Sequence, residues 1–339
     1  MAQRSRVTAF GLLALSAAAA ACRAPGPEVV VYTSEDQVFS EPILRDFEAV
    51  TGITVRAVYD TEEAKGTGVM NRLLSEKDNP QADVYWANEP VRAVLLAQEG
   101  VAAPYVSPEA KGIPERFKDP AGYWTGFSAR ARVIMVRTDA GDAPEPSSLL
   151  AYTDPAWAGR AVIANPLFGT TATEMAAFYA LRGAGALDSL LAGMKANRVE
   201  VSTSNGESAD LVCAGAYAFS VVDSDDAVAR ARRGCPVRIV YPDQDEGAMG
   251  TLILPNAVVL IRDGPHPEQA RRLIDYLLSP ETEARLARSE AAQIPLHGEV
   301  EAPEGVRPIA RILSMPVDYD RVARALRRVS PLLERWMER

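Results

Sequence analysis

The alternation of short apolar runs with helical patterns is the feature that most limits the fold of this chain. Residues 29–32 form an apolar run before a polar turn and a helical pattern, and residues 53–59 alternate as a strand before a helical pattern over 69–77. A third strand-like run, residues 82–86, ends in another polar turn. This order of elements predicts an α/β domain with a parallel sheet covered by helices. Polar turns at the carboxyl ends of such strands are where open α/β sheets bind ligands.

Two long apolar alternations, residues 124–136 and 250–261, are long enough to run from one lobe to another, and between them the strand–helix order restarts. A chain that is 47% hydrophobic and this long can form two compact lobes. We therefore expect lobe 1 to contain residues 29–127 and 250–298, and lobe 2 to contain residues 128–249 and 299–339. The last run, 319–337, has the pattern of an amphipathic helix, which we expect to pack on a lobe rather than on a membrane.

The first 21 residues have the pattern of a bacterial export signal, with two arginines, a short apolar stretch and small residues before a cleavage point. Cys22 follows the small residues as in a lipobox, so we expect cleavage before it and a lipid on its sulfur, with plain secretion as the alternative. Residues 22–28 would form a tether. No other apolar stretch approaches the roughly 18 residues of a membrane span. We expect a lipid-anchored protein of the periplasm or cell envelope that contacts the membrane only through its anchor.

The charge balance limits the partners of the mature chain. The sequence has 36 Lys and Arg residues against 45 Asp and Glu residues, a net charge of -9. Removing residues 1–21 removes two arginines and no acid, which leaves 34 minus 45, or -11. Nucleic-acid binding needs a basic surface, so an acidic chain of this kind is not expected to bind nucleic acid.

The cysteines and histidines are few. Besides Cys22 the chain has Cys213 and Cys235, which in an oxidising compartment either pair around the intervening acidic turn or remain buried thiols. The sequence leaves both states open. The two histidines, His266 and His297, stand in turn-like settings, so a metal site built from Cys and His is not predicted.

An acidic turn, residues 223–226, follows a strand-like run and precedes a helical run. One interpretation is structural: Asp223 or Ser224 is a helix N-cap, and Asp225 and Asp226 interact with the helix dipole. The other interpretation is that Asp223, Ser224 and Asp225 face a cleft and contact a ligand. Taken alone, the turn favours the structural interpretation. Together with the acidic turns of lobe 1 and the family resemblance described below, it favours ligand contact.

The other predicted ligand-binding residues lie in similar turns. In lobe 1 they follow the first and third strands, and in lobe 2 they precede two helices. They are Ser34, Glu35, Asp36, Asn88 and Glu89 in lobe 1, and Gly169, Thr170, Thr171, Ser204 and Asn205 in lobe 2.

The two lobe 2 turns have helix-start patterns. Thr171 and Glu174 have the spacing of a capping box, and Ser204 with Glu207 repeats that spacing. A helix N-terminus that faces a cleft is a ready anion site, because its first backbone N–H groups have no partner within the helix.

Segments spread over most of the mature chain resemble the bacterial periplasmic solute-binding proteins of ABC importers (extracellular solute-binding family 1), and in particular the ferric-iron-binding group with its thiamine- and aminoethylphosphonate-binding relatives. The matching segments are residues 29–36, 47–53, 79–85, 128–133, 166–171, 218–230, 279–283 and 293–296. The resemblance implies the type II periplasmic-binding-protein fold, with two doubly wound α/β lobes joined by two crossing strands. It also implies a monomer that closes on a small solute and delivers it to an ABC permease of the inner membrane.

The resemblance suggests a ligand set but also departs from it. Iron binders of this group have a His at the first turn, a Glu after the third strand, and adjacent tyrosines where this chain has Asp223 and Ser224. Here the first-turn position carries Asp36, the second carries Asn88 beside Glu89, and the tyrosine pair is absent. What remains is a possible metal site of four carboxylates: Asp36, Glu89, Asp223 and Asp225.

Such a carboxylate set favours a cation, since clustered acids repel one another when they are dry and unpaired. Oxygen ligands suit Fe³⁺, Mn²⁺, Ca²⁺ or Mg²⁺. The resemblance implies a phosphate or carbonate held by the lobe 2 turns as a second ligand. Our first expectation is therefore ferric iron or another hard cation with a synergistic anion. The alternatives are a zwitterionic or anionic organic solute, such as an aminophosphonate or a thiamine-like compound, and another small solute.

Proteins of other classes remain as alternatives: a sensor lobe without transport, or an envelope hydrolase. The chain has no G-x-S-x-G elbow and no H-E-x-x-H motif. We therefore do not predict an enzyme, and we expect no required cofactor beyond a possible bound metal ion.

Overall fold

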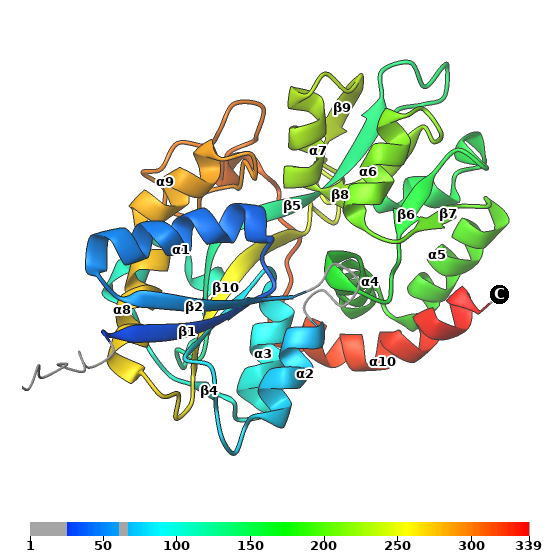
Figure 1. Ribbon diagram of the computed structural model, residues 1–339. Helices are drawn as coiled ribbons and strands as arrows, with labels where there is room; N and C mark the ends of the chain where they lie inside the picture. Colours follow the sequence, from blue (N-terminus) through cyan, green and yellow to red (C-terminus); the bar gives the residue numbers. More distant parts are fainter. Residues whose placement is uncertain (1–25, 61–66, 339) are drawn as a thin grey trace, which may run out of the picture.

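The computed structural model describes residues 26–60 and 67–338, which form two α/β lobes side by side (Figure 1). The expected signal peptide, residues 1–21, and the expected lipidation site, Cys22, lie outside the described residues. Of the expected tether, residues 26–28 are described, and Glu28 already begins the first strand.

Lobe 1 is built on one mixed sheet with the strand order β2-β1-β3-β10-β5. β1 pairs in parallel with β2 and β3, whereas β10 runs antiparallel to β3 and β5. Helix α9 contacts both α1 and α8, and α2 and α3 form a second group (Figure 1). The elements are β1 (Glu28–Thr33), α1 (Gln37–Thr51), β2 (Thr54–Tyr59), α2 (Thr67–Ser75), β3 (Val84–Ala87), α3 (Pro90–Gln98), β4 (Ala102–Ala103), β10 (Ile253–Ile261), α8 (Pro267–Leu277) and α9 (Pro280–Arg288).

Lobe 2 continues the same sheet. The long strand β5 pairs with β10 along its first half and with β8 and β9 along its second half, so it crosses between the lobes as its apolar alternation predicts. A short parallel pair, β6 and β7, lies beside β8 through a bridge from Ala161 to Phe219. The elements are β5 (Thr125–Arg137), β6 (Val162–Ala164), α4 (Gly169–Arg182), α5 (Ala184–Ala196), β7 (Glu200–Ser202), α6 (Asn205–Cys213), β8 (Phe219–Asp223), α7 (Ser224–Arg232) and β9 (Val237–Val240).

The C-terminal helix α10 (Tyr319–Met337) packs mainly on α4 of lobe 2 and also on α3 of lobe 1 (Figure 1). Its apolar face is buried through residues such as Leu326, Val329 and Leu333. Within the described residues, no helix is both long and apolar enough to span a bilayer. The lobe boundaries drawn from the sequence stay a proposal, since β5 and α10 both belong to the contact between the lobes.

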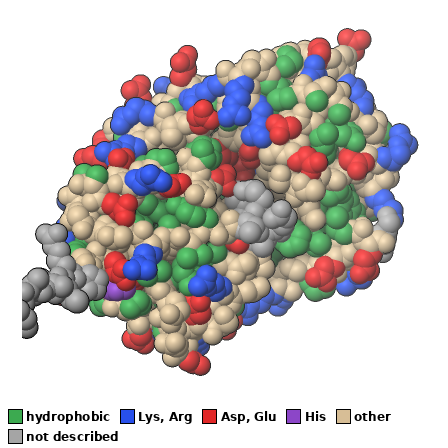
Figure 2. Space-filling model, in the orientation of Figure 1, with side chains coloured by type: hydrophobic (Ala, Val, Ile, Leu, Met, Phe, Trp, Pro, Cys, Tyr) green, Lys and Arg blue, Asp and Glu red, His purple; other side chains and the backbone are tan. Residues whose placement is uncertain are grey.

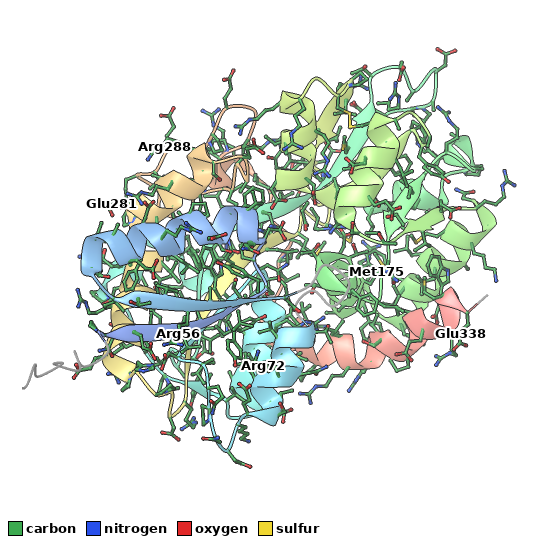
Figure 3. The ribbon with its side chains drawn as sticks, viewed as in Figure 1. Arg56, Arg72, Met175, Glu281, Arg288 and Glu338 are labelled. Atoms are coloured by element: carbon green, nitrogen blue, oxygen red, sulfur yellow. A yellow bond between two sulfur atoms is a disulfide. The ribbon has the colours of Figure 1, made fainter. Side chains whose placement is uncertain are left out.

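Most of the buried side chains are apolar. Met175 on α4 is fully buried within lobe 2, whereas Arg56, Arg288 and Glu338 are exposed (Figure 3). Of the two cysteine states that the sequence leaves open, the structure contains the disulfide, which joins Cys213 at the end of α6 to Cys235 before β9. This bond encloses β8, the acidic turn and α7 in a loop.

Candidate functional site

A cleft lies where the two lobes meet, and the residues around it are mainly polar. Figure 2 shows acidic side chains gathered in the hollow between the lobes. The lining residues are Asp36, Asn88, Ala164, Asn165, Phe168, Gly169, Thr170, Thr171, Thr203, Ser204, Asn205, Gly206, Asp223 and Asp226. The predicted site residues that the structure brings together here are Asp36, Asn88, Gly169, Thr170, Thr171, Ser204, Asn205 and Asp223.

The lobe 1 side of the cleft consists of the turns after β1 and β3. These strands are parallel neighbours, so their carboxyl ends meet at one edge of the sheet. Ser34 joins the two turns: its hydroxyl donates to Asn88 Oδ1 at 3.1 Å and accepts from the Asn88 backbone N–H at 3.1 Å. Asp36 and Asn88 face the cleft from these turns, as the sequence predicts for a shared rim.

The lobe 2 side consists of two helix N-termini. α4 begins at Gly169, whose φ of +56° is a left-handed conformation that glycine adopts without strain. α6 begins at Asn205, and Ser204 caps it by accepting from the Glu207 N–H at 3.1 Å, as predicted. The first N–H groups of a helix have no acceptor within it, and the helix dipole adds positive potential there. Both features favour an anionic group in this part of the cleft.

The capping box expected from Thr171 and Glu174 is wrong. α4 starts before Thr171, its N-cap position is Phe168, and no side chain caps it. Glu174 instead accepts from Arg132 at 3.0 and 3.1 Å, and Thr171 Oγ1 accepts from the same guanidinium at 3.3 Å. The physical reason is that a buried guanidinium requires several oxygen acceptors, and these two side chains supply them.

Arg132 on β5 is fully buried in the wall of lobe 2. Besides Glu174 and Thr171, it donates to Asp223 Oδ1 at 3.0 Å, Asn205 Oδ1 at 3.0 Å and Thr170 Oγ1 at 3.2 Å. One guanidinium therefore holds together the start of α4, the start of α6 and the end of β8.

Arg130 lies two residues earlier on β5 and is also buried. It donates to Glu35 of lobe 1 at 2.8 and 2.9 Å and to Asp225 of lobe 2 at 2.9 Å, and it also contacts the Asn88 carbonyl. Gln293 donates a further hydrogen bond to Glu35 at 2.8 Å. Arg130 is thus a cross-link between the two lobes beneath the cleft.

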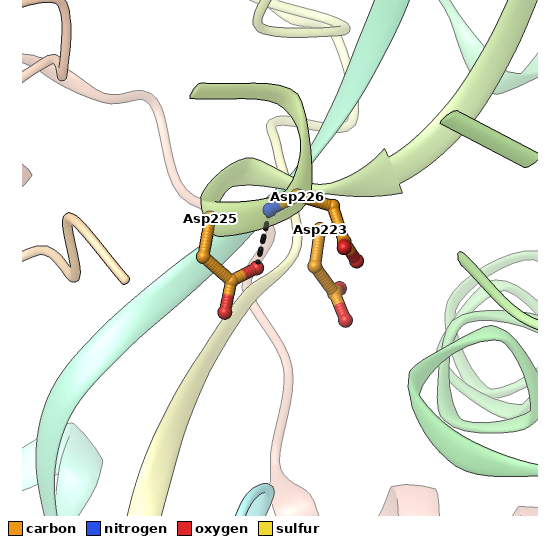
Figure 4. Close-up of side chains that lie close together, drawn as sticks. All are labelled: Asp223, Asp225 and Asp226. Carbon is orange, nitrogen blue, oxygen red and sulfur yellow. Dashed lines mark hydrogen bonds between the residues drawn. The ribbon is translucent and has the colours of Figure 1, made fainter. Parts of the chain in front are cut away.

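The acidic turn starts α7, with the carboxylates of Asp223, Asp225 and Asp226 close together (Figure 4). One oxygen of each lies within 4.8 Å of the others. Asp223 occupies the N-cap position but its side chain makes no capping hydrogen bond, because Arg132, Thr170 and Asn205 bind it instead. Asp223 therefore stands at the cap position of the structural interpretation, whereas its side chain lines the cleft, and its contact with a ligand stays a prediction.

The remaining predicted site residues lie behind the cleft wall. Glu89 caps α3, accepting from the Val91 and Arg92 N–H groups at 2.7 and 3.1 Å. Ser224 accepts from the Ala131 N–H at 3.0 Å, and Asp225 is bound by Arg130. None of these, nor Ser34 or Glu35, is among the cleft-lining residues. The four-carboxylate metal site stays a prediction, but its members do not converge on one point of the cleft.

Burial shifts the pKa values of several of these acids upward. Desolvation raises the pKa of Glu35 to about 7, although the neighbouring Arg130 opposes this shift. Burial likewise raises the pKa of Asp225, Glu89 and Glu174, and each of these shifts is opposed by an arginine. The cleft wall is therefore a set of carboxylates balanced by internal cations.

Sequence reasoning missed the two buried arginines that pair with the acids of the candidate site, and also cleft-lining residues such as Asn165, Thr203 and Asp226. The signal for the arginines is present in the sequence: Arg130 and Arg132 interrupt an otherwise apolar strand at a spacing of two, which places both on one face. Buried charges require partners, so two such arginines predict a set of buried acids on that face.

The chain is similar to a known protein family and to several known bacterial proteins. The model of the family described as "Bacterial extracellular solute-binding protein" matches residues 88–315. Iron uptake protein A1 of Synechocystis sp. is 27% identical over 291 residues, which is 80% of this chain and 78% of the relative. A putative 2-aminoethylphosphonate-binding periplasmic protein of Salmonella typhi is 27% identical over 246 residues, 71% of this chain and 69% of the relative.

The fold is shared with solved structures. The crystal structure of iron-bound HitA from Pseudomonas aeruginosa aligns with a TM-score of 0.80 and 22% identity, covering 91% of this chain and 98% of that one. The predicted type II fold is confirmed.

Proposed function

This chain belongs to the family of bacterial extracellular solute-binding proteins, and on that premise we propose that it captures a small zwitterionic phosphonate or phosphate compound for an ABC importer. The family consists of transport proteins rather than enzymes. The expected location is the periplasm, and the permease of an ABC importer is the expected partner. Lipid anchoring through Cys22 stays a prediction.

One observation carries the proposal: the N-termini of α4 and α6 line the same cleft as Asp36 of the opposite lobe. Helix N-termini favour phosphate and phosphonate groups through backbone N–H donors and the helix dipole. The hydroxyls of Thr170, Thr171 and Ser204 lie in the same wall. A phosphonate group bound there would contact lobe 2.

The acidic side of the cleft favours a positive group on the same molecule. Asp36 enters the cleft from lobe 1. An ammonium group two or three bonds from a phosphonate could contact this carboxylate while the phosphonate contacts the helix N-termini. Charge-assisted hydrogen bonds of this kind are roughly twice as strong as neutral ones.

Because such a solute contacts both lobes, binding would stabilise the closed arrangement around it. Hinge closure of two lobes about a ligand is the mechanism of periplasmic binding proteins. β5, which runs through both lobes, would carry the movement. The closed form would then be the form that the permease recognises.

A hard cation with an anion, our first expectation from the sequence, is the second candidate. It is favoured by the oxygens of Asp223, Asp225 and Asp226, which lie within 4.8 Å of one another. We rank it second because each of these carboxylates is already paired with an arginine, at 2.9 to 3.0 Å.

Isothermal titration calorimetry tests the choice, with 2-aminoethylphosphonate, inorganic phosphate, ferric citrate and manganese(II) as probes. We expect 2-aminoethylphosphonate to bind more tightly than phosphate. Asp36→Asn should weaken 2-aminoethylphosphonate roughly tenfold, the value of one charge-assisted contact, and change phosphate binding little.

Glu41→Gln, at a partly exposed position of α1 that is not among the cleft-lining residues, is the matched control and should alter neither affinity. Stoichiometric binding of ferric citrate or manganese, with no response to either phosphorus compound, would show that the proposal is wrong and that the second candidate is right.

A further inference from the structure

We infer that Arg130 and Arg132 act as resident cations that close the acidic turn to metal ions and thereby set the charge selectivity of the cleft. The inference rests on the proposed function and adds the residues that determine it. It concerns what the acids of the turn bind when no solute is present.

The first step is the occupancy of the carboxylate oxygens. Asp223 Oδ1 accepts from Arg132 at 3.0 Å, and its Oδ2 accepts from Thr170 at 2.8 Å and Asn205 at 3.3 Å. Asp225 Oδ2 accepts from Arg130 at 2.9 Å, and its Oδ1 accepts from the Asp226 N–H at 2.9 Å. All four oxygens of these two carboxylates therefore have protein donors already.

The second step is charge. The arginine guanidinium stays protonated at every physiological pH, so neither cation can be removed by titration. A metal ion that coordinated Asp223 and Asp225 would lie within a few ångströms of both guanidinium groups, which repel it. It would also have to replace hydrogen bonds that these groups make to the same oxygens.

The third step is that neither guanidinium group can move away from its partners at low cost. Arg132 is completely buried, and Arg130 is held between Glu35 and Asp225. Displacing a buried cation from its partners leaves an uncompensated charge in the interior, which is strongly unfavourable. The charges of Asp223 and Asp225 are thus balanced by the two buried arginines. Recognition of the solute then depends on the helix N-termini and Asp36.

The test removes the resident cation and asks whether a metal takes its place. In Arg130→Gln, we expect manganese(II), titrated by calorimetry and by electron paramagnetic resonance, to bind at least tenfold more tightly than to the wild-type protein. The double variant Glu35→Gln/Arg130→Gln removes the ion pair as a whole, so no lobe 1 carboxylate loses its partner, and it should show the same gain. Arg233→Gln, at an exposed surface pair with Glu290, is the control and should show none.

Two outcomes would overturn the inference. One is wild-type protein that binds manganese(II) or ferric citrate stoichiometrically and loses it in Asp225→Asn. The other is a folded Arg130 variant, single or double, without a gain in metal affinity. Titration of the same proteins with 2-aminoethylphosphonate separates the two proposals: wild-type binding of this compound without a metal gain in the variants contradicts the inference alone.

Discussion

At the scale of single residues, the cleft depends on how buried charges are paired. Glu35 shows this most clearly, because it is almost fully buried and yet ion-paired with Arg130 at 2.8 Å. Burial raises its pKa to about 7 even so. The folded protein therefore holds a proton on Glu35 at pH values where the unfolded chain has lost it.

This gives a pH dependence with a definite sign. Between pH 4.5, the usual pKa of Glu, and about 7, the folded state binds more protons than the unfolded state, so the Glu35 contribution to the free energy of unfolding falls as the pH rises. Glu35→Gln should remove this part of the slope, an effect of roughly 1 to 3 kcal/mol across the window. Urea denaturation at pH 4.5, 5.5 and 7 measures it.

Glu281→Gln on the exposed side of α9 is the control and should keep the wild-type slope. A Glu35→Gln protein with an unchanged pH profile would show that Glu35 titrates alike in both states.

At the scale of elements, the disulfide fastens the part of lobe 2 that presents the acidic turn. It links the end of α6 to the segment before β9 over 22 residues, and between them lie β8 and α7. Both α6 and α7 begin at the cleft wall, so their mutual position matters for the site. Cross-linking a loop of this size lowers the entropy of the unfolded chain.

We expect the double variant Cys213→Ser/Cys235→Ser to lose about 3 kcal/mol of unfolding free energy, as loop closure predicts. Guanidinium denaturation of the wild-type and variant proteins, each with and without reductant, gives the value. Reductant should lower the stability of the wild type only. Equal stability of the wild-type and variant proteins in the absence of reductant would contradict a structural role for the bond.

At the scale of the whole molecule, β5 and α10 connect the lobes. β5 is shared by both sheet halves, and α10 packs on α4 and α3 (Figure 1). Arg130 adds an ion-paired cross-link between Glu35 of lobe 1 and Asp225 of lobe 2. A solute in the cleft would act on this arrangement by adding contacts to both rims.

Small-angle X-ray scattering should therefore show a smaller radius of gyration with saturating 2-aminoethylphosphonate than without solute, together with the mass of a monomer in both states. Inorganic phosphate, which lacks the ammonium group for Asp36, should produce a smaller change. An identical profile at saturation, with binding verified by calorimetry, would contradict hinge closure.

The sequence by itself determined the fold class and the turns that carry the site. Strand and helix periodicities, the Ser204 cap and the polar residues after β1 and β3 are local patterns, and local patterns are legible in one sequence. The family resemblance could also be recognised from the sequence, because its matching segments follow one another in the same order along the chain. Of the predicted rim, Ser34 to Asp36 with Asn88 and Glu89, only Asp36 and Asn88 line the cleft. Their turns lie together because parallel neighbours end at the same edge.

Only the tertiary structure decided which acids face the cleft and what they are paired with. Glu35, Asp223 and Asp225 are 91 to 95 residues away from the arginines that bind them, and no spacing rule relates positions so distant. The predicted capping box of Thr171 and Glu174 failed for the same reason, because both side chains accept hydrogen bonds from the distant Arg132. Packing determines the partner of a buried charge, and the partner determines whether a carboxylate remains available to a solute.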